Sequence, residues 1–355
     1  MKVVDRYVGM AAVTGTGLSM LALALIDGLF AFVGEIPDIG RVDYGPLQAM
    51  SFVLLTMPRR IYDLFPTAAL LGALLGVGAL AVNSELVAIR SAGVSRRRIS
   101  AAVIGACVLL LVPVMLMGEW VAPASEQAAQ QLRITHQARD VSVGGASGLW
   151  VRQGDLVVNA GRLLESGALS DVTVYEFGPE RRLVAVSRAS LAQPVDDGWA
   201  LTRLRRTEFS EGGSHTERFR KVTWPELVDP ALLRVAALNP KDLSLRSLSH
   251  FVTYLRDNGI NAYRYEQAYW SKIFFPLTVV ALVIAGLPFV FGPLRQGGFG
   301  QRLFVGIVIG LLFFLFNRLL ERFGAVYHLD PVALALVPPL LVILAAGLYL
   351  RRTFA

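Results

Sequence analysis

The sequence predicts an α-helical membrane protein with six transmembrane helices, three on each side of an inserted β-rich domain. Composition is the first sign, because 54% of the 355 residues are hydrophobic and only 17% are charged, whereas soluble domains carry about 25% charged residues. Uncharged runs of about 20 residues recur, and each can cross the roughly 30 Å of bilayer hydrocarbon as a helix. A polar stretch of short alternating segments separates the third run from the fourth.

The first three spans lie in runs with few or no charges, and they are predicted at residues 7–33, 64–83 and 99–121. Residues 34–63 hold charges of both signs, so we expect them to form a loop outside the membrane. In the second span, Gly72, Gly76 and Gly78 leave one helix face almost without side chains, which is typical of close helix packing in membranes. The third span ends near Trp120, an expected interface anchor.

A short polar segment near residues 84–98 separates the second and third spans. Its charges, one Glu and four Arg, are too costly for lipid, and the excess of Arg places the segment on the cytoplasmic side. Ser84 is a candidate N-cap, Glu85 suits the first helical turn, Leu86 begins an apolar face and Gly93 offers a stop. The pattern predicts a short amphipathic helix that contacts a cytosolic partner. A tight loop that only orients the protein explains it equally well.

The middle of the chain, residues 124–260, consists largely of short alternating runs between turn signals. Strands are predicted at residues 149–152, 155–160, 172–177, 182–186, 199–209 and 215–222. Regular short strands with frequent turns indicate an antiparallel sandwich or jelly roll, with helices flanking it. Val158, Val174 and Leu201 are candidates for its apolar interior. In 199–209 neither face is cleanly apolar, so we expect this strand at an edge or in a groove.

The last part of the chain, residues 261–355, returns to the membrane. Aromatic residues from Tyr263 to Trp270 form an interfacial belt before the fourth span. The remaining spans are predicted at residues 273–294, 303–317 and 331–350. The chain therefore divides into a first membrane part (1–123), the β-rich domain (124–260) and a second membrane part (261–355).

Charge bias predicts the orientation of these spans. The basic residues assigned to the inner tails and loops are Lys2, Arg6, Arg90, Arg96, Arg97, Arg98, Arg295, Arg302, Arg351 and Arg352. Only Asp5 and Glu85 oppose them, whereas acids outnumber basic residues in the short outer loops. By the positive-inside rule, both termini lie in the cytoplasm and the β-rich domain lies outside.

Common catalytic motifs are missing from the sequence. None of the four Lys follows a Gly, so there is no P-loop, and no Ser sits in a nucleophile elbow. The four His are too far apart for an H-E-x-x-H zinc site. We therefore expect no catalytic residue, metal or cofactor in this chain. The net charge of +7 fits inner loops and lipid head groups better than nucleic acid.

Several blocks of sequence resemble one family of membrane proteins. In chain order they are PTAALLGALLGVG (66–78), SELV (84–87) with SAG (91–93), GEWVAP (118–123), WSKIFFPL (270–277) and FGPLR (291–295). Through these blocks, the chain is similar over its whole length to the lipopolysaccharide export permeases of the LptF/LptG type, and more to the LptG branch.

This resemblance implies a transport subunit of an ABC-type exporter in the bacterial inner membrane, with a periplasmic β jelly roll that receives acyl chains. The expected partners are an LptF-type permease in a heterodimer, an LptB-type ATPase dimer that holds ATP and Mg, and LptC- and LptA-type periplasmic proteins. The cargo is lipopolysaccharide, extracted from the inner membrane and passed toward the outer membrane. Residues expected to couple to the ATPase are Ser84, Glu85, Leu86, Arg90 and Gly93.

The resemblance also suggests a role for cations on the predicted outer side of the membrane. Lipid A is a polyanion on an apolar base, so its site needs apolar helix faces with cations at head-group level. The candidate phosphate-binding residues are Arg59, Arg60, Arg133, Lys272 and Arg318. Lys272 and Arg318 are explained equally well by side chains that snorkel to the interface, and a pair of solvated interface residues explains Arg59 and Arg60 somewhat better than a ligand site. Members of the family can carry a Lys near the outer end of the first span, where this chain has Ala31.

Two functions of other classes remain open at this point. A mechanotransmission permease would couple a cytosolic ATPase to periplasmic work without moving a lipid, although such proteins usually need fewer spans. A self-sufficient channel or carrier would require polar residues within the membrane, which this chain lacks. Co-purification of an ATPase with lipopolysaccharide, an ATPase alone, or neither would separate the three.

Overall fold

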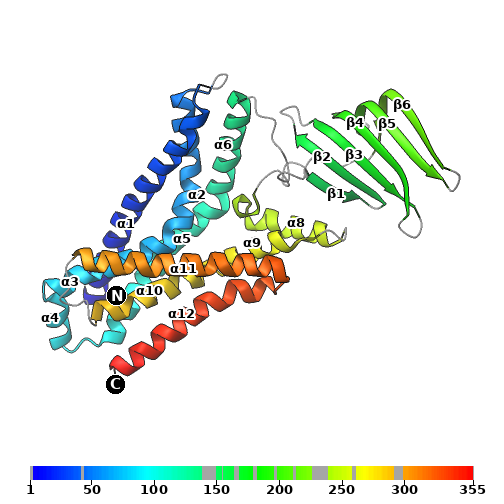
Figure 1. Ribbon diagram of the computed structural model, residues 1–355. Coiled ribbons are helices and arrows are strands. Elements are labelled where there is room, and N and C mark those ends of the chain that lie inside the picture. The colour runs from blue at the N-terminus through cyan, green and yellow to red at the C-terminus, as the bar shows by residue number, and fades with distance from the viewer. Residues whose placement is uncertain are drawn as a thin grey trace. The chain divides into compact units, whose positions relative to one another are not determined.

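The computed structural model divides the chain into two compact units (Figure 1). It describes residues 3–40, 44–137, 149–153, 155–163, 168–178, 182–195, 198–210, 213–225, 239–257, 261–291 and 299–354. The helical unit comprises Met1–Pro37, Ala49–Ala129 and Glu266–Ala355, and the sheet unit comprises Asp38–Gln48 and Gln130–Tyr265. The predicted class, a helical membrane protein with an inserted antiparallel β domain, is confirmed. Residues 292–295 of the FGPLR block lie outside the described residues.

The first half of the chain is helical almost throughout. Its elements are α1 (Val3–Glu35), η1 (Ile36–Asp38), α2 (Pro46–Gly72), η2 (Ala73–Val77), α3 (Gly78–Val82), α4 (Glu85–Ser91), α5 (Arg96–Leu116), η3 (Met117–Val121) and α6 (Ala122–Gln137). The elements η2 and η3 are π-helical turns. The helix continues through each of these turns, so α2 to α3 and α5 to α6 each form one continuous helical run.

The last part of the chain supplies the remaining membrane helices. They are α9 (Tyr263–Ile273), α10 (Phe275–Phe291), α11 (Phe299–Tyr327) and α12 (Pro331–Phe354). In the described residues, five helical runs are long and apolar enough to cross a membrane, and the α9–α10 pair, bent by 55°, brings the number to as many as six. The start of α11, the end of α12 and α4 lie toward one end of the helical unit (Figure 1).

Two predicted span boundaries are wrong in the same way. The loop expected at 34–63 is helical from Pro46 onward, so Arg59 and Arg60 lie within α2 and not before it. The short span expected at 303–317 belongs to α11, which continues past Arg318 to Tyr327. A charged residue ends an apolar run, but Arg and Glu are good helix formers and do not end a helix. Pro46 does mark a helix start, as expected for Pro in the first turn.

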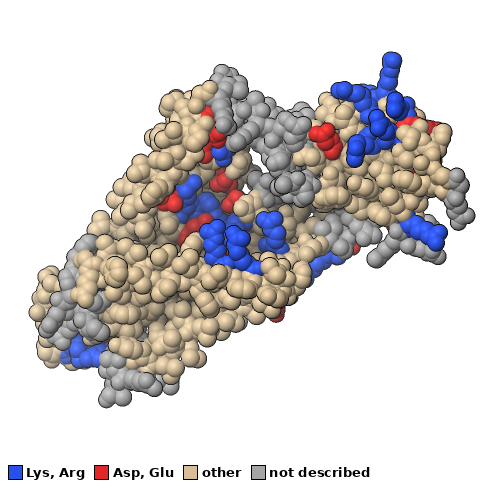
Figure 2. All heavy atoms as spheres, in the orientation of Figure 1, with Lys and Arg blue, Asp and Glu red and all other residues tan. Residues whose placement is uncertain are grey.

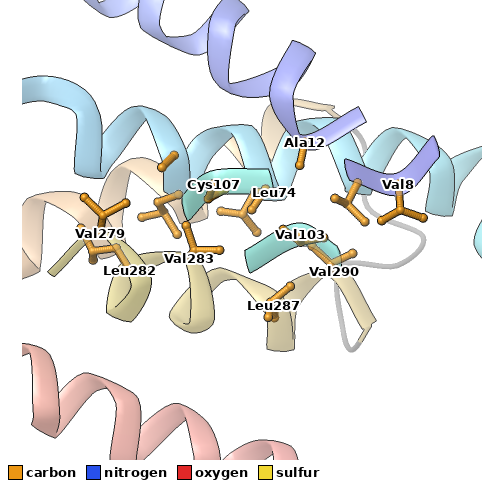
Figure 3. Packing of buried hydrophobic residues seen from close by; sticks show 14 of the residues in the cluster. Val8, Ala12, Leu74, Val103, Cys107, Val279, Leu282, Val283, Leu287 and Val290 are labelled. Carbon is orange, nitrogen blue, oxygen red and sulfur yellow. The ribbon is translucent and has the colours of Figure 1, made fainter. Parts of the chain in front are cut away.

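The core of the helical unit forms where α1, η2, α5 and α10 converge (Figure 3). Val8 of α1, Leu74 of η2, Val103 of α5 and Val283 of α10 are all completely buried there. The predicted role of the small residues is confirmed where α1 crosses α2 and η2. A Cβ atom on Gly72 or Gly76 would lie well under 3.0 Å from α1 atoms, so only Gly permits this approach.

The sheet unit contains six strands in sequential order, each antiparallel to its neighbours. They are β1 (Leu149–Gln153), β2 (Leu156–Leu163), β3 (Leu169–Phe177), β4 (Leu183–Val195), β5 (Gly198–Ser210) and β6 (Gly213–Trp224). Apolar side chains of β2 to β5 form a buried cluster that includes Val158, Val174 and Leu201. After the strands come η6 (Pro240–Asp242) and α8 (Leu245–Asp257), whose buried face includes Leu248 and Phe251.

The strand expected at an edge, 199–209, is an interior strand. It is β5, which pairs with β4 on one side and β6 on the other. Leu201 and Leu204 are both buried although three positions separate them, because Arg203 has a left-handed backbone (φ 52°) that changes the alternation between them. The prediction assigned residues 199–209 to two faces by strict alternation. This assignment put residues of both faces together, so neither predicted face was cleanly apolar.

Candidate functional site

The helical unit brings cations of two helices together on one aromatic ring, that of Tyr62 in α2. The guanidinium carbon of Arg59 lies 5.5 Å from the ring centroid, and Nζ of Lys272, from α9, lies 6.0 Å from it. Both distances fall within the range of cation–π attraction. On the face of the molecule shown in Figure 2, charged side chains of the helical unit are few, and most of them gather around its middle, with a few basic ones at the lower left.

Packing fixes the position of this ring. Tyr62 stacks on Phe275 of α10, with ring centroids 4.1 Å apart and planes at 14°. A Cβ atom added to Gly118, in the π-helical turn η3, would lie within 3.1 Å of three Tyr62 ring carbons. Three helical runs therefore hold the ring, and Gly118 leaves the space for it. We call Arg59, Tyr62, Gly118, Lys272 and Phe275 the Tyr62 cluster.

Both cations of the Tyr62 cluster are shielded from solvent. The side chain of Arg59 is 11% exposed and donates through Nε to Asp63, at 3.0 Å, and Lys272 is 7% exposed. A buried cation interacts more strongly with an anion than an exposed one, because water screens it less. The cluster therefore offers a guanidinium fork and an ammonium group to an anionic ligand beside an apolar helix surface.

The other predicted phosphate-binding residues make separate contacts. Arg60 donates to Asp27 of α1 at 2.7 Å and to Thr56 at 3.0 Å, so it joins α2 to α1. Arg318 lies over the ring of Phe314 on its own helix, at 5.8 Å. Arg133 belongs to the sheet unit, where it pairs with Asp38 at 3.1 Å.

Sequence reasoning missed the residues that organise the Tyr62 cluster. Tyr62 follows Arg59 by three positions, a spacing that puts the two side chains on one helix face once the segment is known to be helical. Gly118 stands in the GEWVAP block, but nothing in the sequence pairs it with Tyr62. Asp27 was the one charge inside the first predicted span, and charged residues in spans usually have a partner.

The predicted coupling segment is helical, but it starts differently from expectation. α4 spans Glu85–Ser91, and Gly93 follows in a left-handed conformation (φ 86°), as expected for a C-terminal stop. Ser84 is also left-handed (φ 60°) and its side chain caps nothing, so the predicted N-cap is wrong. The next helix, α5, does have a side-chain cap, because Ser95 accepts a hydrogen bond from the backbone N–H of Arg98.

Two polar contacts tie the coupling segment to the start of α1. The Tyr7 hydroxyl donates to Glu85 Oε2 at 2.5 Å. Arg98 forms a two-pronged ion pair with Asp5, at 2.8 and 2.9 Å. Leu86 is buried, whereas Arg90 is exposed. Glu85 therefore contacts α1 within the chain, and the outward surface of α4 is formed by residues such as Arg90.

The candidate lipid-path residues of the sheet unit lie on one apolar face. Val158 and Val174 are directly opposite each other in β2 and β3, and these two residues and Leu201 are at most 1% exposed. The face ends in a charged contact, because Arg206 pairs with Glu176 at 2.9 Å and lies over the ring of Trp224 at 5.8 Å. The three residues are thus core positions of the sheet.

Comparison with known proteins gives one consistent result. Residues 6–352 match the family described as lipopolysaccharide export system permease LptF/LptG. The chain is 34% identical over 342 residues to the lipopolysaccharide export system permease protein LptG of Escherichia coli K12, covering 95% of this chain and 94% of that protein. It is 32% identical over 350 residues to LptG of Haemophilus influenzae, covering 98% of each.

Proposed function

The chain belongs to the LptF/LptG family of lipopolysaccharide export permeases, and we propose that it is the LptG-type subunit of an exporter that moves lipopolysaccharide from the inner membrane toward the outer membrane. The observation that carries this function is the family match over residues 6–352, which includes both the helical unit and the inserted sheet. The mechanotransmission permease and the self-sufficient channel have no comparable support.

ATP hydrolysis is assigned to a separate LptB-type ATPase dimer, which would hold ATP and Mg. The missing P-loop supports this division of labour, and α4 offers a short amphipathic surface for contact with the ATPase. Leu86 anchors α4 in the helical core, while Val87 and Arg90 are exposed. Movement of the ATPase would reach α1 through the Tyr7–Glu85 hydrogen bond.

An LptF-type permease is the proposed partner within the membrane. Only 11% of the residues in the most apolar stretch of α1, and likewise of α11, are buried within the chain. Such faces suit contact with a second permease, with membrane lipid and with the acyl chains of the cargo. LptC- and LptA-type proteins would receive the lipid on the periplasmic side.

The Tyr62 cluster is the proposed contact for lipopolysaccharide phosphates in this chain. Arg59 and Lys272 sit at one ring and are nearly buried, so a phosphate that reached them would lose little interaction to water. Arg60 and Arg318 have separate contacts in the helical unit and are assigned to secondary contacts with the same polyanion, and Arg133, in the sheet unit, is assigned to a contact of its own with lipopolysaccharide. Acyl chains would then follow the apolar face of the sheet at Val158, Val174 and Leu201.

The proposed location is the bacterial inner membrane, with both termini in the cytoplasm and the sheet unit in the periplasm. Six spans, with the bent α9–α10 pair counted as one, would put both ends on one side, and the excess of basic residues beside α4 and at the termini favours the cytoplasm. In this orientation, the Tyr62 cluster lies nearer the periplasm than α4 does.

Co-purification tests this function. The tagged chain is extracted from bacterial membranes in mild detergent, and native mass spectrometry identifies what remains bound. We expect an ATPase, a second permease and lipopolysaccharide. An ATPase without lipopolysaccharide would indicate mechanotransmission. The absence of both the ATPase and lipopolysaccharide would indicate a self-sufficient channel. Either of these results would refute the proposed function.

A further inference from the structure

Three arginines lie side by side across neighbouring strands of the sheet unit. Arg188 of β4 is directly opposite Arg205 of β5, and Arg205 is directly opposite Arg218 of β6. Arg203 lies two positions before Arg205 in β5, Arg220 lies two positions after Arg218 in β6, and all five side chains are exposed. Basic side chains gather over this part of the sheet in Figure 2. We call these five residues the arginine patch.

This arrangement opposes the stability of the sheet. Adjacent strands are about 4.8 Å apart, and like charges directly opposite each other destabilise a strand pair. No acid of the described residues forms an ion pair with any member of the patch. Their neighbour Arg206 shows what a structural arginine does here, because it pairs with both Glu176 and Glu208. A row of unneutralised arginines therefore indicates an external anion.

The arginine patch covers the face of the sheet opposite the apolar core. Residues next to the row, Ala189 in β4 and Leu204 in β5, are buried in that core, and successive side chains of a strand point to opposite faces. The sheet order ends at β6, so the row reaches the last strand. An amphipathic molecule at this edge can have its chains on one face and its head group on the other.

We propose that the arginine patch binds the clustered phosphate groups of the lipopolysaccharide head, a site distinct from the Tyr62 cluster; this rests on the proposed function. All members are Arg, whose planar fork binds phosphate through two parallel hydrogen bonds, whereas Lys acts as a point charge. A row at strand spacing suits several phosphates on one saccharide better than a single anion. The apolar face behind the row fits the acyl chains of the same molecule.

Site-specific photo-crosslinking in the purified permease–ATPase complex tests this site. One crosslinker replaces Thr216, which lies opposite Thr207 beside the arginine row, and another replaces the inward Val174. With phosphorylated lipopolysaccharide, we expect adducts at both positions. Changing Arg188, Arg205 and Arg218 together to Gln should lower the Thr216 adduct at least about tenfold, the effect of losing about one charge-assisted contact. The Val174 adduct should persist.

Three matched samples make the result specific. Dephosphorylated lipopolysaccharide should label Val174 but not Thr216, and 0.3 M salt should weaken only the Thr216 adduct. A triple Lys variant keeps the charge and should label Thr216 less than the native chain but more than the Gln variant. The Gln variant should unfold at the same or a higher temperature, because it removes like-charge repulsion.

The contrary outcomes are separable. If lipopolysaccharide labels both positions and the triple Gln variant leaves the Thr216 adduct unchanged, the arginine patch does not bind the phosphates, but the proposed function stands. Thr216 adducts with a protein would assign the patch to an acidic partner, and equal competition by phosphatidylglycerol vesicles would assign it to the membrane surface; both overturn the proposal. No lipopolysaccharide adduct at either position would refute the proposed function as well.

Discussion

Gly118→Ala tests whether the space beneath Tyr62 matters for the Tyr62 cluster. The new methyl group would lie within 3.1 Å of three Tyr62 ring carbons, whereas carbon atoms pack at about 3.5–4.0 Å. The two nearest of these carbons would be only 2.3 and 2.4 Å away, so the ring would have to retreat by about 1 Å. Because Phe275 stacks on it, the retreat disturbs α10 as well as the contacts with Arg59 and Lys272. Overpacking of this kind costs about 1–3 kcal/mol, and loss of the cation–π contacts about 0.5–2 kcal/mol.

Gly105→Ala is the matched control, since Gly105 lies earlier in the same helical run with nothing within 4 Å of its added Cβ. Both substitutions gain the same helix propensity, so the difference between them isolates the clash. In the purified complex, Gly118→Ala should lower the midpoint of thermal unfolding and weaken lipopolysaccharide binding measured by crosslinking, while Gly105→Ala should do neither. Equal behaviour of the two variants would refute the packing argument and the role of Tyr62 in holding the cations.

Three further predictions follow from other parts of the structure. Gly76→Ala should separate α1 from η2 and lower the thermal unfolding midpoint, whereas Gly17→Ala, with open space at its Cβ, should not; equal midpoints would contradict the close crossing. Glu85→Lys removes the acceptor of the Tyr7 hydroxyl and reverses a charge in the first turn of α4, so ATPase turnover stimulated by lipopolysaccharide should fall with normal membrane insertion; unchanged turnover and transport would count against coupling through this helix. Leu201→Ala, at a fully buried position, should destabilise the sheet by about 2–5 kcal/mol in chemical unfolding, and Leu183→Ala, at 38% exposure, should cost clearly less; similar losses would contradict the assigned core.

The class of fold could be predicted because hydrophobicity and charge are local properties of the sequence. Runs without charges located the helices, and the glycines of the second span indicated close helix packing, for which the structure shows α1 as the partner. The predicted helices corresponding to α2 and α11 were too short, because the absence of charges shows where a chain can lie in lipid and not where a helix ends. Arg59, Arg60 and Arg318 were consequently taken as flanking residues, although all three are helical.

The candidate sites were harder to predict, since their contacts join distant parts of the chain. Tyr62 and Gly118 meet only after α2 and η3 have packed, and no spacing rule connects them. In the sheet, the left-handed residue Arg203 changed the alternation that strand assignment depends on. Ser84 and Ser95 are equally good capping residues by type, and the backbone before each helix decides which one caps.

The π-helical turns have a consequence for insertions and deletions in this chain. A π turn accommodates one more residue than an α turn, and each residue of an α-helix rotates the chain by about 100°. η2 lies between Tyr62 and the α4 segment and holds its additional residue within one turn. Removing one residue from Ala73–Val77 would therefore restore a regular α-helix and leave Tyr62 and α4 facing nearly as they do now, whereas removing one residue from the regular helix beside the turn would rotate Tyr62 by about 100° relative to α4. The π turn is the place in this helical run where a one-residue change in length keeps the cations and the coupling helix facing their separate partners.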